Sequence, residues 1–119
     1  MINYFDLTDK DDIFYAVEGD YDFYIRGYKG NDVLFAFDGD NELIGDQGND
    51  QLYAGSGDDL MFGGVGDDTL IGAAGDDTLV GGSGDDVLMG GDNADALFGA
   101  DGQDTLFGGL GDDSLTGRA

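Results

Sequence analysis

Carboxylates at a fixed spacing are the residues of this chain most able to do chemistry. From residue 27 to residue 116 the sequence divides without a gap into ten nonapeptides, and the sixth position is Asp in nine of them and Asn41 in the other. Carboxylate oxygens are hard donors, and Ca²⁺ takes six to eight such ligands. The chain has no His and no Cys, so zinc and copper sites are not expected. The repeated Asp therefore favours calcium.

Two further positions of the nonapeptide are nearly constant, and they indicate the elements that position the carboxylates. The fourth position is Gly in nine repeats and Asn93 in the other, which suits a backbone with positive φ. The eighth position is Leu in nine repeats and Met61 in the other, which predicts an inward side chain at the centre of a three-residue strand. The first six residues would then form a turn. Two nonapeptides would make one coil, and equivalent residues would stack every eighteen positions.

This pattern predicts an all-β fold, a right-handed parallel β-roll (a β-solenoid) of about five to six coils. Stacking would place the sixth-position side chains in two ladders. Two like charges about 5 Å apart repel by about 0.8 kcal/mol in water and by about 3 kcal/mol at an effective dielectric constant near 20. A divalent cation between them would reverse that repulsion and add to the free energy of folding. The expected ladders are Asp32, Asp50, Asp68, Asp86 and Asp104 on one side, and Asn41, Asp59, Asp77, Asp95 and Asp113 on the other.

The ends of the chain depart from the repeat. Residues 1–26 hold two degenerate repeats, 7–15 and 16–24, followed by an apparent two-residue slip at Ile25 and Arg26. Ten of the fourteen aromatic residues lie within the first 37 positions, and solenoids need atypical terminal units to cover the core. We therefore predict an amino-terminal cap over residues 1–26, a roll over 27–116 and a tail over 117–119.

The nonapeptides resemble the glycine-rich RTX (repeats-in-toxin) motif, Gly-Gly-x-Gly-x-Asp-x-U-x, in which U is a large apolar residue. The resemblance implies a calcium ion between loops eighteen residues apart, bound by two Asp and by backbone carbonyls from positions two and four of one loop and one and three of the next. It implies about eight ions, with a weaker site at Asn41 and one or two more at Asp12 and Asp22. One interior site would use Gly55, Gly57 and Asp59 with Gly72, Ala74 and Asp77, and another Gly64, Gly66 and Asp68 with Gly81, Ser83 and Asp86. The same rule adds Gly63, Val65, Ala73, Gly75, Gly82 and Gly84 as carbonyl ligands of neighbouring sites.

The overall charge limits the other partners. A net charge of −23 disfavours nucleic acid and anionic membrane surfaces, and no segment predicts membrane insertion or an amino-terminal signal peptide. The resemblance implies a non-enzymatic, calcium-dependent folding module of a secreted, extracellular bacterial protein exported by type I secretion. End-to-end self-association or docking to a neighbouring domain is a further expectation.

An alternative function is an interaction module, an adhesin or an enzyme-targeting domain, that uses an apolar sheet face. The ninth position would supply outward apolar ladders, namely Phe35, Tyr53, Ile71, Met89 and Phe107 on one face and Ile44, Phe62, Val80 and Phe98 on the other. The acidic fifth position is expected to be solvated surface charge. Paired with the sixth, it could also suggest acid/base dyads, but so many copies fit a structural repeat better than one active site.

Overall fold

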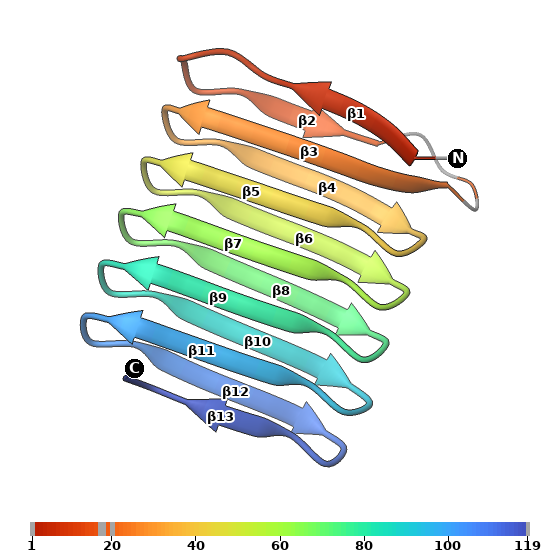
Figure 1. Cartoon of the computed structure of the whole chain (residues 1–119), viewed down its shortest axis with the longest axis vertical. Coiled ribbons are helices and arrows are strands. Elements are labelled where there is room, and N and C mark those ends of the chain that lie inside the picture. Colours follow the sequence, from red (N-terminus) through yellow and green to blue (C-terminus); the bar gives the residue numbers. More distant parts are fainter. Residues whose placement is uncertain (1, 17–18, 20, 119) are drawn as a thin grey trace.

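The computed structural model describes residues 2–16, 19 and 21–118, and within these residues it contains thirteen β-strands and no helix. Odd-numbered strands form one parallel sheet and even-numbered strands form the other (Figure 1). The strands are β1 (Ile2–Asp6), β2 (Ile13–Tyr15), β3 (Asp22–Lys29), β4 (Val33–Asp38), β5 (Glu42–Gln47), β6 (Gln51–Ser56), β7 (Leu60–Val65), β8 (Thr69–Ala74), β9 (Thr78–Ser83), β10 (Val87–Asp92), β11 (Ala96–Asp101), β12 (Thr105–Leu110) and β13 (Ser114–Thr116).

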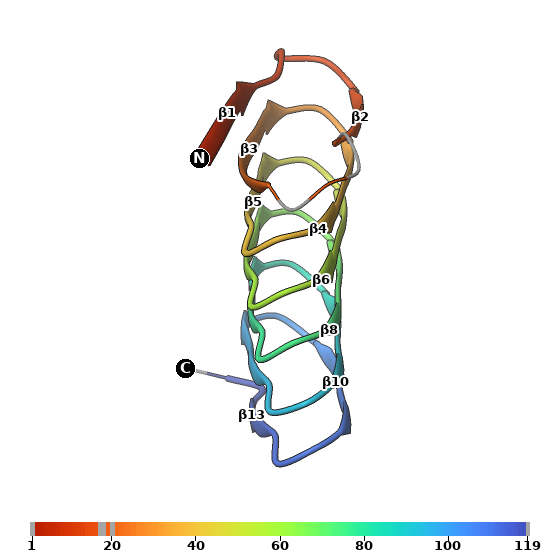
Figure 2. The same ribbon diagram turned by 90° about the vertical axis from the view of Figure 1, so that its right-hand side faces the viewer.

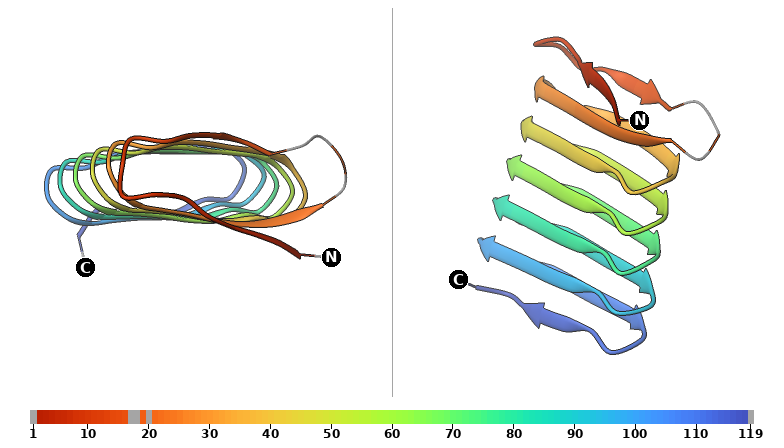
Figure 3. Two further views of the ribbon diagram at one scale, coloured as in Figure 1. Left: turned by 90° about the horizontal axis from the view of Figure 1, so that it is seen from above. Right: turned by 45° about the vertical axis from the view of Figure 1, so that its right-hand side comes forward.

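The chain winds as a solenoid of about six turns. Each strand is followed by one in the opposite sheet, and strands two apart in the sequence are hydrogen-bonded neighbours. The two sheets lie face to face in the edge-on view of Figure 2, and the coils form a stack of flattened rings in Figure 3. The predicted all-β parallel roll is confirmed.

A constant register of eighteen residues aligns equivalent positions from β3 onward. Leu52 pairs with Leu70, and Leu70 pairs with Leu88. Side chains of the eighth position therefore stack between the sheets and form a core that is fully buried over most of the roll. Its fully buried members are Ile25, Leu34, Leu43, Leu52, Met61, Leu70, Leu79, Leu88 and Leu97. Removing these apolar groups from water stabilises the roll by about 1.5–3 kcal/mol for each side chain.

The strands are longer than the sequence pattern predicts. β6 through β12 each have six residues, which are positions seven to nine of one repeat and one to three of the next. Only positions four to six form the turn, so the expectation of a three-residue strand and a six-residue turn was wrong. Hydrogen bonds between coils cause the difference, because they continue through positions two and three, where Gly64 pairs with Gly82 and Val65 with Ser83.

The amino-terminal strands continue the roll with a shifted register. Ile13 pairs with Val33 at a separation of twenty residues, whereas Tyr24 pairs with Glu42 at eighteen. The two extra residues therefore lie between β2 and β3, a segment in which Val17, Glu18 and Asp20 fall outside the described residues. The predicted slip at Ile25 and Arg26 was wrong, because Ile25 is a core residue opposite Leu43.

Aromatic side chains pack around these first coils. The Phe5 ring lies 4.7 Å from the Phe14 ring centroid and 6.1 Å from that of Phe23. On the even-numbered sheet, Tyr15, Phe35 and Tyr53 stack with centroid distances of 4.9 Å and 4.5 Å. Such pairs contribute about 0.5–1.5 kcal/mol each beyond the area they bury. The cap assigned to residues 1–26 and the tail at 117–119 stay predictions.

Candidate metal centre

The sixth-position side chains lie in the turns, along the two edges where the chain crosses between the sheets. One ladder follows β3, β5, β7, β9 and β11, and the other follows β4, β6, β8, β10 and β12. Eight of the ten members are buried although they are polar or charged, and Asp104 and Asp113 at the last coil are half-buried. The predicted stacking in two ladders is confirmed.

One oxygen of each carboxylate is held by the backbone of the preceding coil. The Asp50 N–H donates to Asp68 Oδ1 at 2.7 Å, and the Asp68 N–H donates to Asp86 Oδ1 at 2.8 Å. On the other edge, the Asp59 N–H donates to Asp77 Oδ1 at 2.9 Å. The carboxylates are therefore fixed in orientation, each one coil apart.

The other oxygen of these carboxylates is buried and accepts no hydrogen bond within the described part of the chain. Buried charged atoms without a partner are rare in folded proteins, because the lost hydration is costly. A repeated orphan oxygen of this kind points to a cationic ligand. The orphan atoms are Oδ2 of Asp32, Asp50, Asp59, Asp68, Asp77, Asp86, Asp95 and Asp104.

Glycine at position one leaves room beside every orphan oxygen except that of Asp59, whose repeat begins with Ala54. A Cβ on Gly63 would overlap Asp68 Oδ2 and would lie 2.6 Å from the carbonyl oxygen of Gly81 in the next coil. A Cβ on Gly72 would likewise overlap Asp77 Oδ2 and would lie 2.8 Å from the Gly90 carbonyl oxygen. A carboxylate and a carbonyl of the following coil thus border one small space, as the predicted calcium site requires.

The other predicted carbonyls fall into two groups. Among the described residues, the position-four carbonyls of Gly57 and Gly66 accept no backbone hydrogen bond. The position-three carbonyls do accept one, since the Gly57 N–H donates to Ala74 at 2.9 Å and the Gly66 N–H donates to Ser83 at 2.8 Å. Carbonyl oxygens have two lone pairs, so both groups retain capacity for a metal ion. Val65 belongs to the second group, because its carbonyl accepts a hydrogen bond from the Gly48 N–H.

Position two has positive φ throughout the repeats, which the sequence pattern alone did not assign. Gly55, Gly64 and Gly82 have φ between 111° and 114°, while Ala73 has φ 91°. Tyr28, Phe37 and Asp46 also replace Gly here and have φ between 75° and 79°. Left-handed backbone costs a non-Gly residue about 1–2 kcal/mol, so these loops are strained.

Burial changes the acidity of the ladder. Loss of hydration, together with the neighbouring carboxylates, raises the pKa of Asp59 and Asp68 to about 7 and that of Asp50 and Asp77 to about 6. The hydrogen bonds that these carboxylates accept from the preceding coil lower the pKa, but they offset only part of the rise. A cation in the bordering space would favour the ionised form.

A second ladder, formed by the fifth position, was missed by sequence reasoning. The Asp85 N–H donates to Asp67 Oδ1 at 2.9 Å, and the Asp67 N–H donates to Asn49 Oδ1 at 2.9 Å. These oxygens accept from the next coil, whereas the sixth-position oxygens accept from the preceding coil. The fifth position is exposed, as expected, but it also joins neighbouring turns. The sequence signal for this ladder was the mixture of Asp and Asn at the fifth position, since both are short residues whose side-chain oxygen can accept a hydrogen bond.

Two degenerate loops differ from the expectation of further sites. Asp12 occupies position six, but its Oδ2 accepts hydrogen bonds from the Thr8 N–H at 2.9 Å and the Thr8 hydroxyl at 2.7 Å. Asp22 occupies position five, because its Oδ1 accepts from the Asp40 N–H, and Phe23 takes position six. The expectation that Asp22 ends a ligand loop was therefore wrong, and its cause is the misplaced two-residue slip.

Comparison with known proteins decides the family. The model of the RTX calcium-binding nonapeptide repeat matches the chain in overlapping segments, 24–52, 35–70, 53–88, 71–106 and 89–119. The chain belongs to this RTX repeat family. No curated protein and no solved structure matches. The orphan carboxylates are thus found in repeats of a family that binds calcium, and this RTX roll is a calcium-binding module.

The donor set of the RTX roll fits a calcium ion. No group of three or more acidic side chains among the described residues gathers where it could hold a metal. Each proposed site instead combines two carboxylates with backbone carbonyls, all of them the hard oxygens that Ca²⁺ prefers.

None of the described residues form a helix long and apolar enough to cross a membrane.

Proposed function

We propose that this RTX roll is a calcium-dependent folding module of a secreted protein, non-enzymatic on its own, with the sixth-position carboxylates as its ligands. The observation that carries the proposal is the set of eight buried Oδ2 atoms without a partner among the described residues, six of which lie beside a carbonyl of the next coil. Without a cation, the folded roll keeps these carboxylates buried and close to one another. Calcium removes that cost only in the folded state, so binding and folding are coupled.

The setting that suits this coupling is extracellular. RTX repeats are typical of secreted bacterial proteins. Extracellular calcium modules bind with dissociation constants of about 10⁻⁴–10⁻³ M, far above cytosolic calcium. Such a chain would stay unfolded before export, consistent with type I secretion, and would fold outside the cell. An interaction module remains the alternative prediction, with the outward ninth position as its surface.

Circular dichroism with and without chelator tests the proposal. Calcium should convert a largely disordered spectrum into a β-rich one, cooperatively, because each interior carboxylate borders two sites. A β-rich spectrum that persists unchanged in excess chelator would refute calcium-dependent folding.

The substitution Asp68→Asn tests the ligand assignment. Asp68 lies between Asp50 and Asp86 in its ladder, so two sites lose a charge and the calcium midpoint should rise several-fold. Asp67→Asn is a matched control with the same change in charge. Its amide oxygen can still accept from Asp85, as Asn49 accepts from Asp67, so its midpoint should stay near that of the parent. Equal midpoints for both variants would show that the sixth position is not the ligand.

A further inference from the structure

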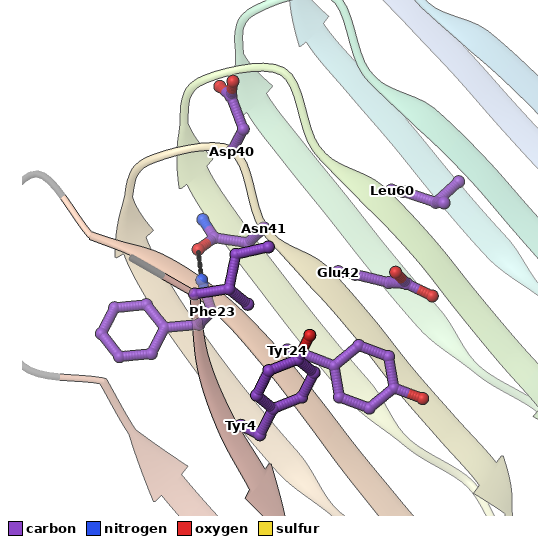
Figure 4. Close-up of a pocket in the computed structure, with 8 residues that line it drawn as sticks. Tyr4, Phe23, Tyr24, Asp40, Asn41, Glu42 and Leu60 are labelled. Atoms are coloured by element: carbon purple, nitrogen blue, oxygen red, sulfur yellow. Dashed lines mark hydrogen bonds between the residues drawn. The ribbon is translucent and has the colours of Figure 1, made fainter.

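Asn41 differs from the Asp residues of its ladder because its side-chain polar atoms all have partners. Its Oδ1 accepts the Phe23 N–H at 3.0 Å, the contact drawn in Figure 4. Its Nδ2 donates to the Gly39 carbonyl at 2.9 Å and to Asp59 Oδ1 at 3.0 Å. Asp59, Asp77 and Asp95, which follow in this ladder, each keep by contrast a buried oxygen without a partner among the described residues.

The amide contacts two groups of the predicted donor set; at Asp59 it meets Oδ1, the oxygen that also accepts the Asn41 N–H, while Asp59 Oδ2 keeps no partner among the described residues. Gly39 is at position four and Asp59 is at position six of the loop one coil later, so both belong to the donor set of the first site on this edge. An amide NH₂ carries two N–H groups and can satisfy two acceptors. The amide therefore links the two loops as an ion would. A cation bound at this site would have only one carboxylate, that of Asp59, to neutralise.

The preceding coil supplies no carboxylate at the sixth position of this edge. Phe23 occupies position six, is buried, and packs near the Phe5 ring. Figure 4 shows Phe23 and Asn41 beside a cavity of about 220 Å³ that Tyr4 and Tyr24 also line. Phe23 provides only its backbone N–H to the ladder, and Asn41 accepts it. At the sixth position, the amino-terminal end of this edge therefore carries an aromatic and an amide side chain, while the carboxylates of Asp40 and Glu42 also line the cavity.

We propose that the Asn41 side-chain amide replaces one calcium ion, so that the edge beginning at Asn41 binds three ions and the edge beginning at Asp32 binds four. This inference rests on the proposed calcium function. In place of a weakened eighth site, it assigns the role of that ion to the amide. The turn at Gly39–Asn41 then stays joined to the Asp59 turn at low calcium, which gives the roll one metal-free junction near its amino-terminal end.

Ion counting by native mass spectrometry tests this assignment. The parent protein should bind seven calcium ions at saturation, and Asn41→Asp should bind one more, because the variant restores a carboxylate and removes the two amide N–H groups. Asn49→Asp is the matched control. It makes the same change in charge at position five, where the carboxylates of Asp67 and Asp58 already accept a backbone hydrogen bond, so its ion count should equal that of the parent.

Nuclear magnetic resonance of the Asn41 side-chain NH₂ gives an independent reading on the parent protein. Its two proton signals should stay protected from solvent exchange at saturating calcium, because the bonds to Gly39 and Asp59 persist. Equal ion counts for the parent and Asn41→Asp, or loss of that protection on adding calcium, would overturn the inference while leaving the proposed function intact. A parent protein that binds no calcium would refute the proposed function itself.

Discussion

Glycine at position four lies where the backbone of the preceding coil passes close by. At Gly66, φ is 132°, and a Cβ there would overlap the carbonyl oxygen of Gly48 in the preceding coil. Nothing surrounds the corresponding point at Gly117 within 4 Å. The same residue type is therefore under steric constraint at one site and free of it at the other.

This contrast gives a prediction at the residue scale. Gly66→Ala should lower the free energy of unfolding by about 1–3 kcal/mol, the usual cost of a strained backbone, with a further loss from the overlap. Gly117→Ala should change it by less than about 0.5 kcal/mol. Thermal unfolding of both variants in saturating calcium measures the difference. Equal stability of the two variants would mean that the close approach at Gly66 relaxes without cost.

At the scale of the turn, the fifth-position ladder stops at one residue. The Ala94 N–H donates to Asp76 Oδ1 at 3.0 Å, but the Ala94 side chain offers no oxygen to the loop that contains Asp112. Ala94→Asn should supply this acceptor and raise the free energy of unfolding by about 0.5–1.5 kcal/mol, the net value of a typical hydrogen bond. Chemical denaturation with calcium present measures the gain.

The control for Ala94→Asn is Ala94→Leu, which is similar in shape to the amide but has no acceptor. It should bring no gain. If the two variants are equally stable, the fifth-position bonds contribute nothing measurable to the roll.

How much of each element was predictable depends on whether a residue type carries the signal. Leu70 and its equivalents, with Asp68 and its equivalents, are distinctive side chains at a fixed spacing, so the core and both ladders followed from the sequence. The extension of the strand through Gly63 and Gly64 could not be predicted in this way. Glycine has no side chain to indicate a strand, and the hydrogen bonds between coils that extend this one are not visible in the sequence. Asn41 was predicted to weaken a site by its missing charge, but the direction of its amide depends on the neighbouring coils, which the sequence does not show.

At the scale of the whole molecule, the buried carboxylates couple stability to pH. Their pKa values are raised to about 6 or 7 at Asp50, Asp59, Asp68 and Asp77, from 3.8 without burial. Between about pH 4 and pH 7, the calcium-free folded roll therefore binds more protons than the unfolded chain. Its stability is greatest at the acidic end of this range and falls as pH rises.

In calcium-free buffer, the β-content measured by circular dichroism should accordingly be higher at pH 5 than at pH 8. With calcium present the trend should reverse, because protons compete with the ion for the same oxygens and acid raises the calcium midpoint. A calcium-free spectrum independent of pH would contradict the burial of ionisable carboxylates. Asp59→Asn should reduce the pH dependence, since one titrating group is removed.

The constant register of eighteen residues makes the roll a one-dimensional lattice with a single coil as its unit cell. From β3 onward each strand meets its neighbour at the same offset. Excising residues 63–80 would join Phe62 to Gly81, which is equivalent to Gly63 and lies in the same sheet, so each later strand would find an equivalent partner. Excising nine residues would send every later strand to the opposite sheet and exchange the faces on which the ninth-position side chains lie. Length can therefore change by whole coils without altering either surface.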